Sequence, residues 1–68
     1  MNNSEKHDLE DMIDKYGLAG VLSETESICY KKAEHIVSSY DDQDTAERWG
    51  EAGAEICKVY NEVVNMFD

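Results

Sequence analysis

Proline is absent from this 68-residue sequence, and basic residues are few. The absence of proline removes the residue that most often interrupts a helix. Six Lys and Arg stand against sixteen Asp and Glu, which gives a formal net charge of −10. Phosphate binding depends on clusters of cations, so this composition disfavours direct binding to nucleic acid and to anionic membranes. The expected partner is a basic protein surface, and the alternative is that the acidity only maintains solubility.

Long apolar runs are missing too. No segment approaches the ~20 apolar residues that cross a bilayer. The start of the chain, from Met1 to Glu5, lacks the basic region and apolar core of a signal peptide. We therefore expect a cytoplasmic protein in which the two cysteines are thiols.

Soft metal ligands are limited to His7, His35, Cys29 and Cys57. They form neither a Cys-x-x-Cys motif nor a histidine pair at i and i+4, so we expect no metal and no cofactor. Cys29 and Cys57 lie almost equidistant from a predicted turn, and a disulfide is the alternative to two buried thiols. Three short helices are too small to enclose a catalytic pocket, so a non-enzymatic protein is expected.

Apolar residues make up 41% of the chain, which is ordinary for a folded domain. We expect one small domain over residues 1–68. Its core must be thin, because so short a chain buries only about 60% of its surface on folding. Efficient packing, a staple or a partner chain must add stability, so a homodimer is a second expectation.

Three amphipathic helices are predicted, at about residues 4–16, 18–40 and 44–67. The first has one apolar face, made by Leu9, Met12, Ile13 and Tyr16. Gly17 follows this helix as an expected αL cap. The second helix has an alternative start at Ser23, which forms a capping-box pattern with Glu26. Asp44 and Glu47 form a similar pair at the start of the third.

The third predicted helix has the most regular pattern in the chain. Its apolar stripe alternates spacings of three and four residues, through Ala46, Trp49, Gly53, Ile56, Tyr60, Val63 and Phe67. A break of three or four residues before this helix places it antiparallel to the second helix. The predicted fold is therefore all-α, a three-helix arrangement built on an antiparallel helical hairpin whose open groove is closed by the first helix.

Carboxylates are expected on the outward side of the third helix, at Asp44, Glu47, Glu51, Glu55 and Glu62. Repulsion between such neighbours costs roughly 0.2–0.5 kcal/mol per pair, so selection for stability alone would mix the signs. Asp8 and Asp11 belong to a second acidic patch on the first helix. We interpret both groups as partner-binding residues that resemble a phosphate backbone offered to a basic cleft. The alternative is an ordinary solvated helix surface.

Gly50 and Gly53 lie within the third predicted helix, where each costs about 1 kcal/mol relative to Ala. They make this section thin, so either a neighbouring helix or a side chain of a partner packs there. Trp49 beside them is interpreted as a core anchor or as an interface hot spot.

The run from Met12 to Leu22, followed by Ile28 to Ile36 and Trp49, resembles a group of short acidic bacterial, cyanobacterial and phage proteins. This group has no assigned activity, and the resemblance implies a cytosolic accessory protein of a bacterium or mobile element. In size, acidity and helix content the chain is also similar to phage-encoded inhibitors such as anti-CRISPR proteins and DNA mimics.

Three functional hypotheses follow from the sequence. The first is a non-enzymatic protein-binding module, such as a phage inhibitor, whose acidic helical surface binds a basic partner in the cytoplasm. The second is a homodimeric structural or adaptor module without nucleic-acid mimicry. The third is a redox- or metal-responsive helical protein that uses Cys29 and Cys57.

Overall fold

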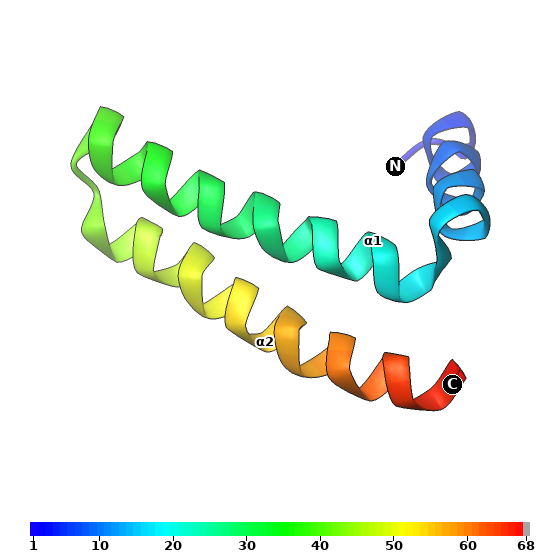
Figure 1. The fold of residues 1–68 in the computed structure, drawn as a ribbon. Coiled ribbons are helices and arrows are strands. Elements are labelled where there is room, and N and C mark those ends of the chain that lie inside the picture. Colours follow the sequence, from blue (N-terminus) through cyan, green and yellow to red (C-terminus); the bar gives the residue numbers. More distant parts are fainter. Residues whose placement is uncertain (68) are drawn as a thin grey trace.

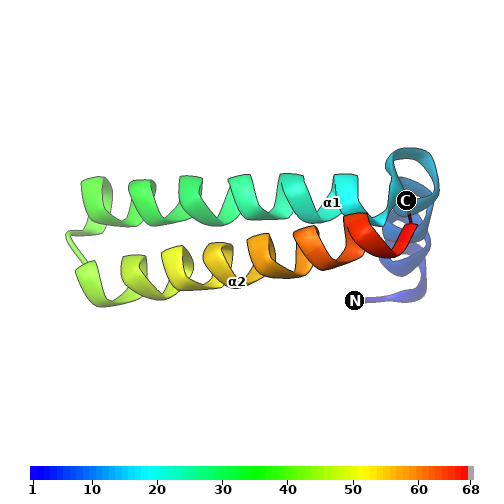
Figure 2. The same ribbon diagram turned by 60° about the horizontal axis from the view of Figure 1, so that its bottom comes forward.

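The computed structural model describes residues 1–67 and contains two helices, α1 (Asn3–Tyr40) and α2 (Gln43–Phe67). Figures 1 and 2 show α2 lying antiparallel to the C-terminal part of α1, side by side with it in both views. The N-terminal part of α1 leaves this hairpin crosswise at its open end. The prediction of an all-α hairpin is confirmed, and residues 1–67 contain no strand.

The predicted division into three helices is wrong, because α1 is one helix with a kink at Gly17. This glycine has φ 81° and ψ 156°, a conformation that is essentially restricted to glycine. It is not the expected αL cap, which requires a much smaller ψ. A single residue redirects the helix here, so no loop separates two helices. We call residues 3–16 the arm and residues 18–40 the stem of α1.

The stem continues through Ser23 without a new helix start. The Thr25 hydroxyl donates a hydrogen bond to the carbonyl oxygen of Val21 at 2.7 Å, as a helix-interior residue does. The alternative start at Ser23, with its capping box, is therefore not adopted. The stem ends at Asp41, which has the αL conformation and donates its N–H to the carbonyl oxygen of Val37 at 3.2 Å.

The start of α2 is capped by Asp42. Its carboxylate accepts hydrogen bonds from the backbone N–H of Thr45 at 3.1 Å and from the Thr45 hydroxyl at 2.7 Å. The expected cap at Asp44 and Glu47 was therefore two residues too late, and α2 begins at Gln43, one residue before the predicted start. Only Asp41 and Asp42 connect α1 to α2. So short a connection places α2 antiparallel to the stem and beside it.

The core is a single seam between the stem and α2. In the described part of the chain its buried residues are Cys29, Ala46, Gly53 and Val63. The thinnest extent of the Cα trace is 14 Å, the thickness of two helices whose axes lie about 8–10 Å apart. Each helix therefore keeps both flanks of the seam exposed.

The arm does not close the groove of the hairpin as predicted. Its residues Leu9, Met12 and Tyr16 line a groove together with Val21, Thr25 and Ile28 of the stem, so it covers one face at the open end only. An arm of residues 3–16 is about 21 Å long, and its crosswise direction leaves most of the seam beyond its reach. No helix within residues 1–67 is long and apolar enough to cross a membrane.

We expect the substitution Gly17→Ala to destabilise the kinked fold by about 1–3 kcal/mol, because an L side chain rarely adopts this backbone conformation. Urea unfolding followed by circular dichroism measures the change. Gly50→Ala is the matched control, since an added Cβ there meets nothing within 4 Å. It should stabilise the protein by up to about 1 kcal/mol. Equal stability of the two variants would contradict the kink.

Hydrogen bonds from Thr45 hold the pKa of the Asp42 carboxyl below its usual value of 3.8. The carboxylate therefore stabilises the fold above that pH, and its contribution is lost as the pH falls through the lowered pKa. We expect Asp42→Ala to lower the melting temperature at neutral pH, and the difference from the wild type to shrink in acid. Thermal melts over this range test the prediction, with Asp44→Ala as a control that should cost less.

Candidate functional site

The carboxylates predicted on the third helix lie along the outer edge of α2. Asp44, Glu47, Glu51, Glu55 and Glu62 are all exposed. Successive helical residues are about 100° apart, which places this line opposite Gly53 in the buried seam. We call these five residues the acidic edge. It extends over about 27 Å, because Asp44 and Glu62 are 18 residues apart at ~1.5 Å per residue.

Few cations neutralise the acidic edge. Lys58 Nζ lies 2.9 Å from Glu55 Oε1, and both side chains are 70% exposed. The hydrogen bond to Glu55 raises the pKa of Lys58, so the ammonium is charged at neutral pH. Arg48 is the other cation of α2. Five carboxylates therefore face two cations, and an exposed pair of this kind contributes little to stability.

The second acidic patch remains separate from the acidic edge. Asp8 and Asp11 are exposed on the arm, next to Glu10, whose Oε2 lies 4.0 Å from His7 Nδ1. Residues of the arm line a groove with the stem, whereas the acidic edge lies opposite Gly53 of the buried seam and so points away from the stem. The structure does not join the two predicted partner-binding groups into one surface.

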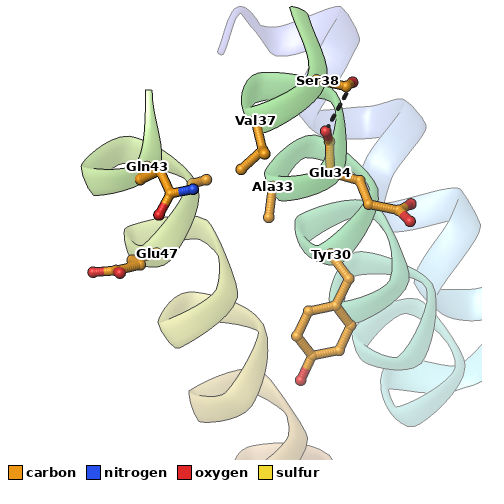
Figure 3. Close-up of a pocket in the computed structure, with 8 residues that line it drawn as sticks. Tyr30, Ala33, Glu34, Val37, Ser38, Gln43 and Glu47 are labelled. Atoms are coloured by element: carbon orange, nitrogen blue, oxygen red, sulfur yellow. Dashed lines mark hydrogen bonds between the residues drawn. The ribbon is translucent and has the colours of Figure 1, made fainter. Parts of the chain in front are cut away.

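The two mid-helix glycines differ in their surroundings. Tyr30 of the stem packs over Gly53, where an added Cβ would lie 2.7 Å from Tyr30 Cε1. Figure 3 shows this ring directed from the stem toward α2. Burial, together with the Glu26 carboxylate, raises the pKa of Tyr30, so its hydroxyl is neutral. The thin section at Gly53 is therefore occupied within the chain, whereas Gly50 is open.

Trp49 is half-buried beside the seam, so it contributes to the core and still presents part of its ring outward. Lys32 Nζ of the stem lies 5.5 Å from the centroid of the Trp49 ring, a cation–π distance. Neither this contact nor the contact of Tyr30 with Gly53 was predicted from the sequence. Each depends on how two helices are rotated against each other.

The cap at the start of α1 was not predicted, although the sequence contains its usual motif. Asn2 and Glu5 form a capping box at the start of α1, with Glu5 N donating to Asn2 Oδ1 at 2.8 Å and Asn2 N donating to Glu5 Oε1 at 3.1 Å. The spacing of a cap residue and a Glu three residues later is the usual signature.

The two cysteines are free thiols, with Cys29 buried and Cys57 half-buried. The structure thus has thiols where a disulfide was the alternative. Within the described residues, no group of three or more His, Cys, Asp and Glu side chains is placed to hold a metal ion.

The geometry defines an all-α protein built on a helical hairpin with a crosswise arm. Comparison of the chain with protein-family models, with curated proteins and with solved structures gives no match. The exposed surfaces of the hairpin and the arm are therefore the features that indicate a function.

We expect Gly53→Ala to stabilise the protein less than Gly50→Ala does. The new methyl group displaces the Tyr30 ring, and this offsets the helix-propensity gain of about 1 kcal/mol. Adding Tyr30→Ala should remove the conflict. The unfolding free energies of the wild type, both single variants and the double variant give the coupling between the two positions. A coupling of zero would show that the ring does not pack on Gly53.

Proposed function

We propose that this chain is a non-enzymatic protein-binding module whose acidic edge engages a basic surface on a partner protein. The acidic edge itself carries the proposal: five exposed carboxylates lie along one side of α2 and face only Lys58 and Arg48. Like charges one helical turn apart repel each other, so this arrangement costs stability in the free protein. Cations of a partner would remove that repulsion on binding.

The spacing of the carboxylates supports a particular kind of basic surface. Five charges that span about 27 Å are on average ~7 Å apart along the helix. Duplex DNA carries one charge per ~1.7 Å of its axis, and one strand carries one per ~3.4 Å. The acidic edge has roughly a quarter of the duplex density, which favours a narrow cationic strip over a cleft that surrounds a whole duplex.

A phage or mobile-element inhibitor that blocks nucleic-acid access to such a strip is the specific form of this proposal. Its support is the net charge of −10 and the acidic edge. A cytoplasmic location in a bacterial host is part of the same proposal. Direct contact with nucleic acid is not, because the cations are too few and too scattered.

A homodimeric structural or adaptor module is the second candidate function. The observation that favours it is the exposure of large apolar side chains on both helices, among them Ile28 and Val59. The two candidates are compatible provided that the dimer leaves the acidic edge exposed.

Replacing Glu47, Glu51 and Glu55 together by Gln tests the acidic edge. The probe is a fluorescent oligoarginine peptide, whose affinity is measured by fluorescence anisotropy. Each exposed ion pair contributes up to about 1 kcal/mol, so we expect the triple variant to bind about tenfold more weakly at low salt.

A matched triple variant provides the control. Glu10→Gln, Glu24→Gln and Glu34→Gln change the net charge by the same amount, and all three side chains are exposed on α1. This variant should bind the peptide nearly as well as the wild type. Equal weakening by both triple variants would show that binding follows total charge, and the role of the acidic edge would be rejected.

A further inference from the structure

One face of the hairpin is mostly apolar and poor in carboxylates, with Glu24 at its edge. The contact of Lys32 with Trp49 shows which sides of the stem and of α2 belong together on this face. Helical rotation of about 100° per residue then assigns its other members. We call it the Trp49 face, and apart from Glu24 at the edge its residues are Val21, Thr25, Ile28 and Lys32 of the stem and Trp49, Ala52, Ile56 and Val59 of α2.

The opposite face is more polar. It carries Tyr30 and Val37 of the stem together with Gln43 and Glu47 of α2, which line a shallow groove (Figure 3). The Trp49 face is the more apolar of the two, yet much of it is exposed in the single chain. Ile28 is 51% exposed, and Trp49 and Ile56 are only half-buried.

The total exposed area indicates how much surface is uncovered. The chain exposes 5458 Å², whereas a compact monomer of 7.7 kDa exposes roughly 4,300 Å². The excess of roughly 1,100 Å² is comparable to the ~800 Å² that each partner contributes to a standard protein interface. The radius of gyration, 14.0 Å, also exceeds the ~11 Å expected for a compact domain of this length.

We infer that a second copy of this chain docks on the Trp49 face, so that two hairpins pack face to face as a four-helix core. A two-fold interface uses the same patch on both subunits, and an apolar patch is complementary to itself. Two chains of charge −10 repel each other, and they approach with less repulsion through a face that is poor in carboxylates and carries Lys32. A basic partner, in contrast, would be attracted to the acidic edge.

The arm supports a second copy at this position. Its groove with Val21, Thr25 and Ile28 places it on the same side of the hairpin as the Trp49 face. The arm is about 21 Å long, roughly twice the 8–10 Å that separates the axes of packed helices. It therefore extends beyond its own hairpin, to where the helices of a second copy would lie. The groove of about 630 Å³ between arm and stem would then receive apolar side chains of the second copy.

Sedimentation equilibrium from low to high micromolar concentration tests the inference on the wild-type chain. We expect a mass approaching twice the 7.7 kDa of one chain. Trp49 is the single tryptophan, so its emission should shift to shorter wavelength over the same concentrations as the ring becomes buried. A mass that stays at 7.7 kDa at high micromolar concentration would overturn the inference.

Matched substitutions on the two faces locate the interface. Val59 of the Trp49 face is 44% exposed, and Val37 of the opposite face is 40% exposed. Val59→Glu should weaken the dimer by about tenfold or more, because it buries an unpaired carboxylate, whereas Val37→Glu should leave the dimer intact. Circular dichroism checks the fold, and Ile28→Glu provides a second variant on the Trp49 face. If Val37→Glu weakened the dimer as much as Val59→Glu did, or if only Val37→Glu weakened it, the Trp49 face would be rejected as the interface.

This inference rests on the second candidate function, the homodimer, and salt separates it from the proposed binding of a basic partner, on which it does not depend. Added sodium chloride should strengthen the dimer, because it screens the repulsion between two acidic chains. The same salt should weaken binding of the oligoarginine peptide to the acidic edge. Val59→Glu adds a carboxylate one helical turn from Glu55 and should not weaken peptide binding, so failure of one proposal does not remove the other. A dimer that weakens as salt rises would contradict docking through the Trp49 face.

Discussion

Two helices share only one seam, and this limit governs the rest of the structure. Small residues lie along the seam, at Cys29, Ala46 and Gly53, and the Tyr30 ring packs over Gly53 of α2. Small residues also bury little apolar area, and hydrophobic stabilisation is roughly proportional to that area. The hairpin therefore combines close packing with a small core, and larger apolar side chains remain on its flanks.

Features that depend on near neighbours in the sequence could be predicted. The all-α class, the hairpin and the start of α2 to within one residue followed from helical spacing and a short polar break. Gly17 was recognised as the point where the first helix changes, but the resulting division into three helices was wrong. Spacing does not reveal that one glycine can redirect a helix without a loop. Met12 of the arm and Ile28 of the stem line one groove, and periodicity does not encode the arm direction that brings them there.

In the candidate site, too, some features could be predicted from the sequence and others could not. The outward position of the acidic edge follows from helical rotation alone, so the sequence was sufficient for it. The packing of Tyr30 on Gly53 and of Lys32 on Trp49 depends on how the stem and α2 are rotated about their axes. That rotation is fixed by the packing of whole side chains in the seam, and no local pattern reports it.

Around α2, the seam, the Trp49 face and the acidic edge point in three different directions, which lets the two proposed interactions support each other. A second copy on the Trp49 face leaves both acidic edges on the outside of the dimer. Two edges on one particle raise the effective concentration of one when the other is bound, so a partner with two basic surfaces gains affinity. The partner's cations also neutralise the charge that keeps two acidic chains apart. Because such coupling is reciprocal, a basic partner that favours the dimer is itself bound more tightly by the dimer.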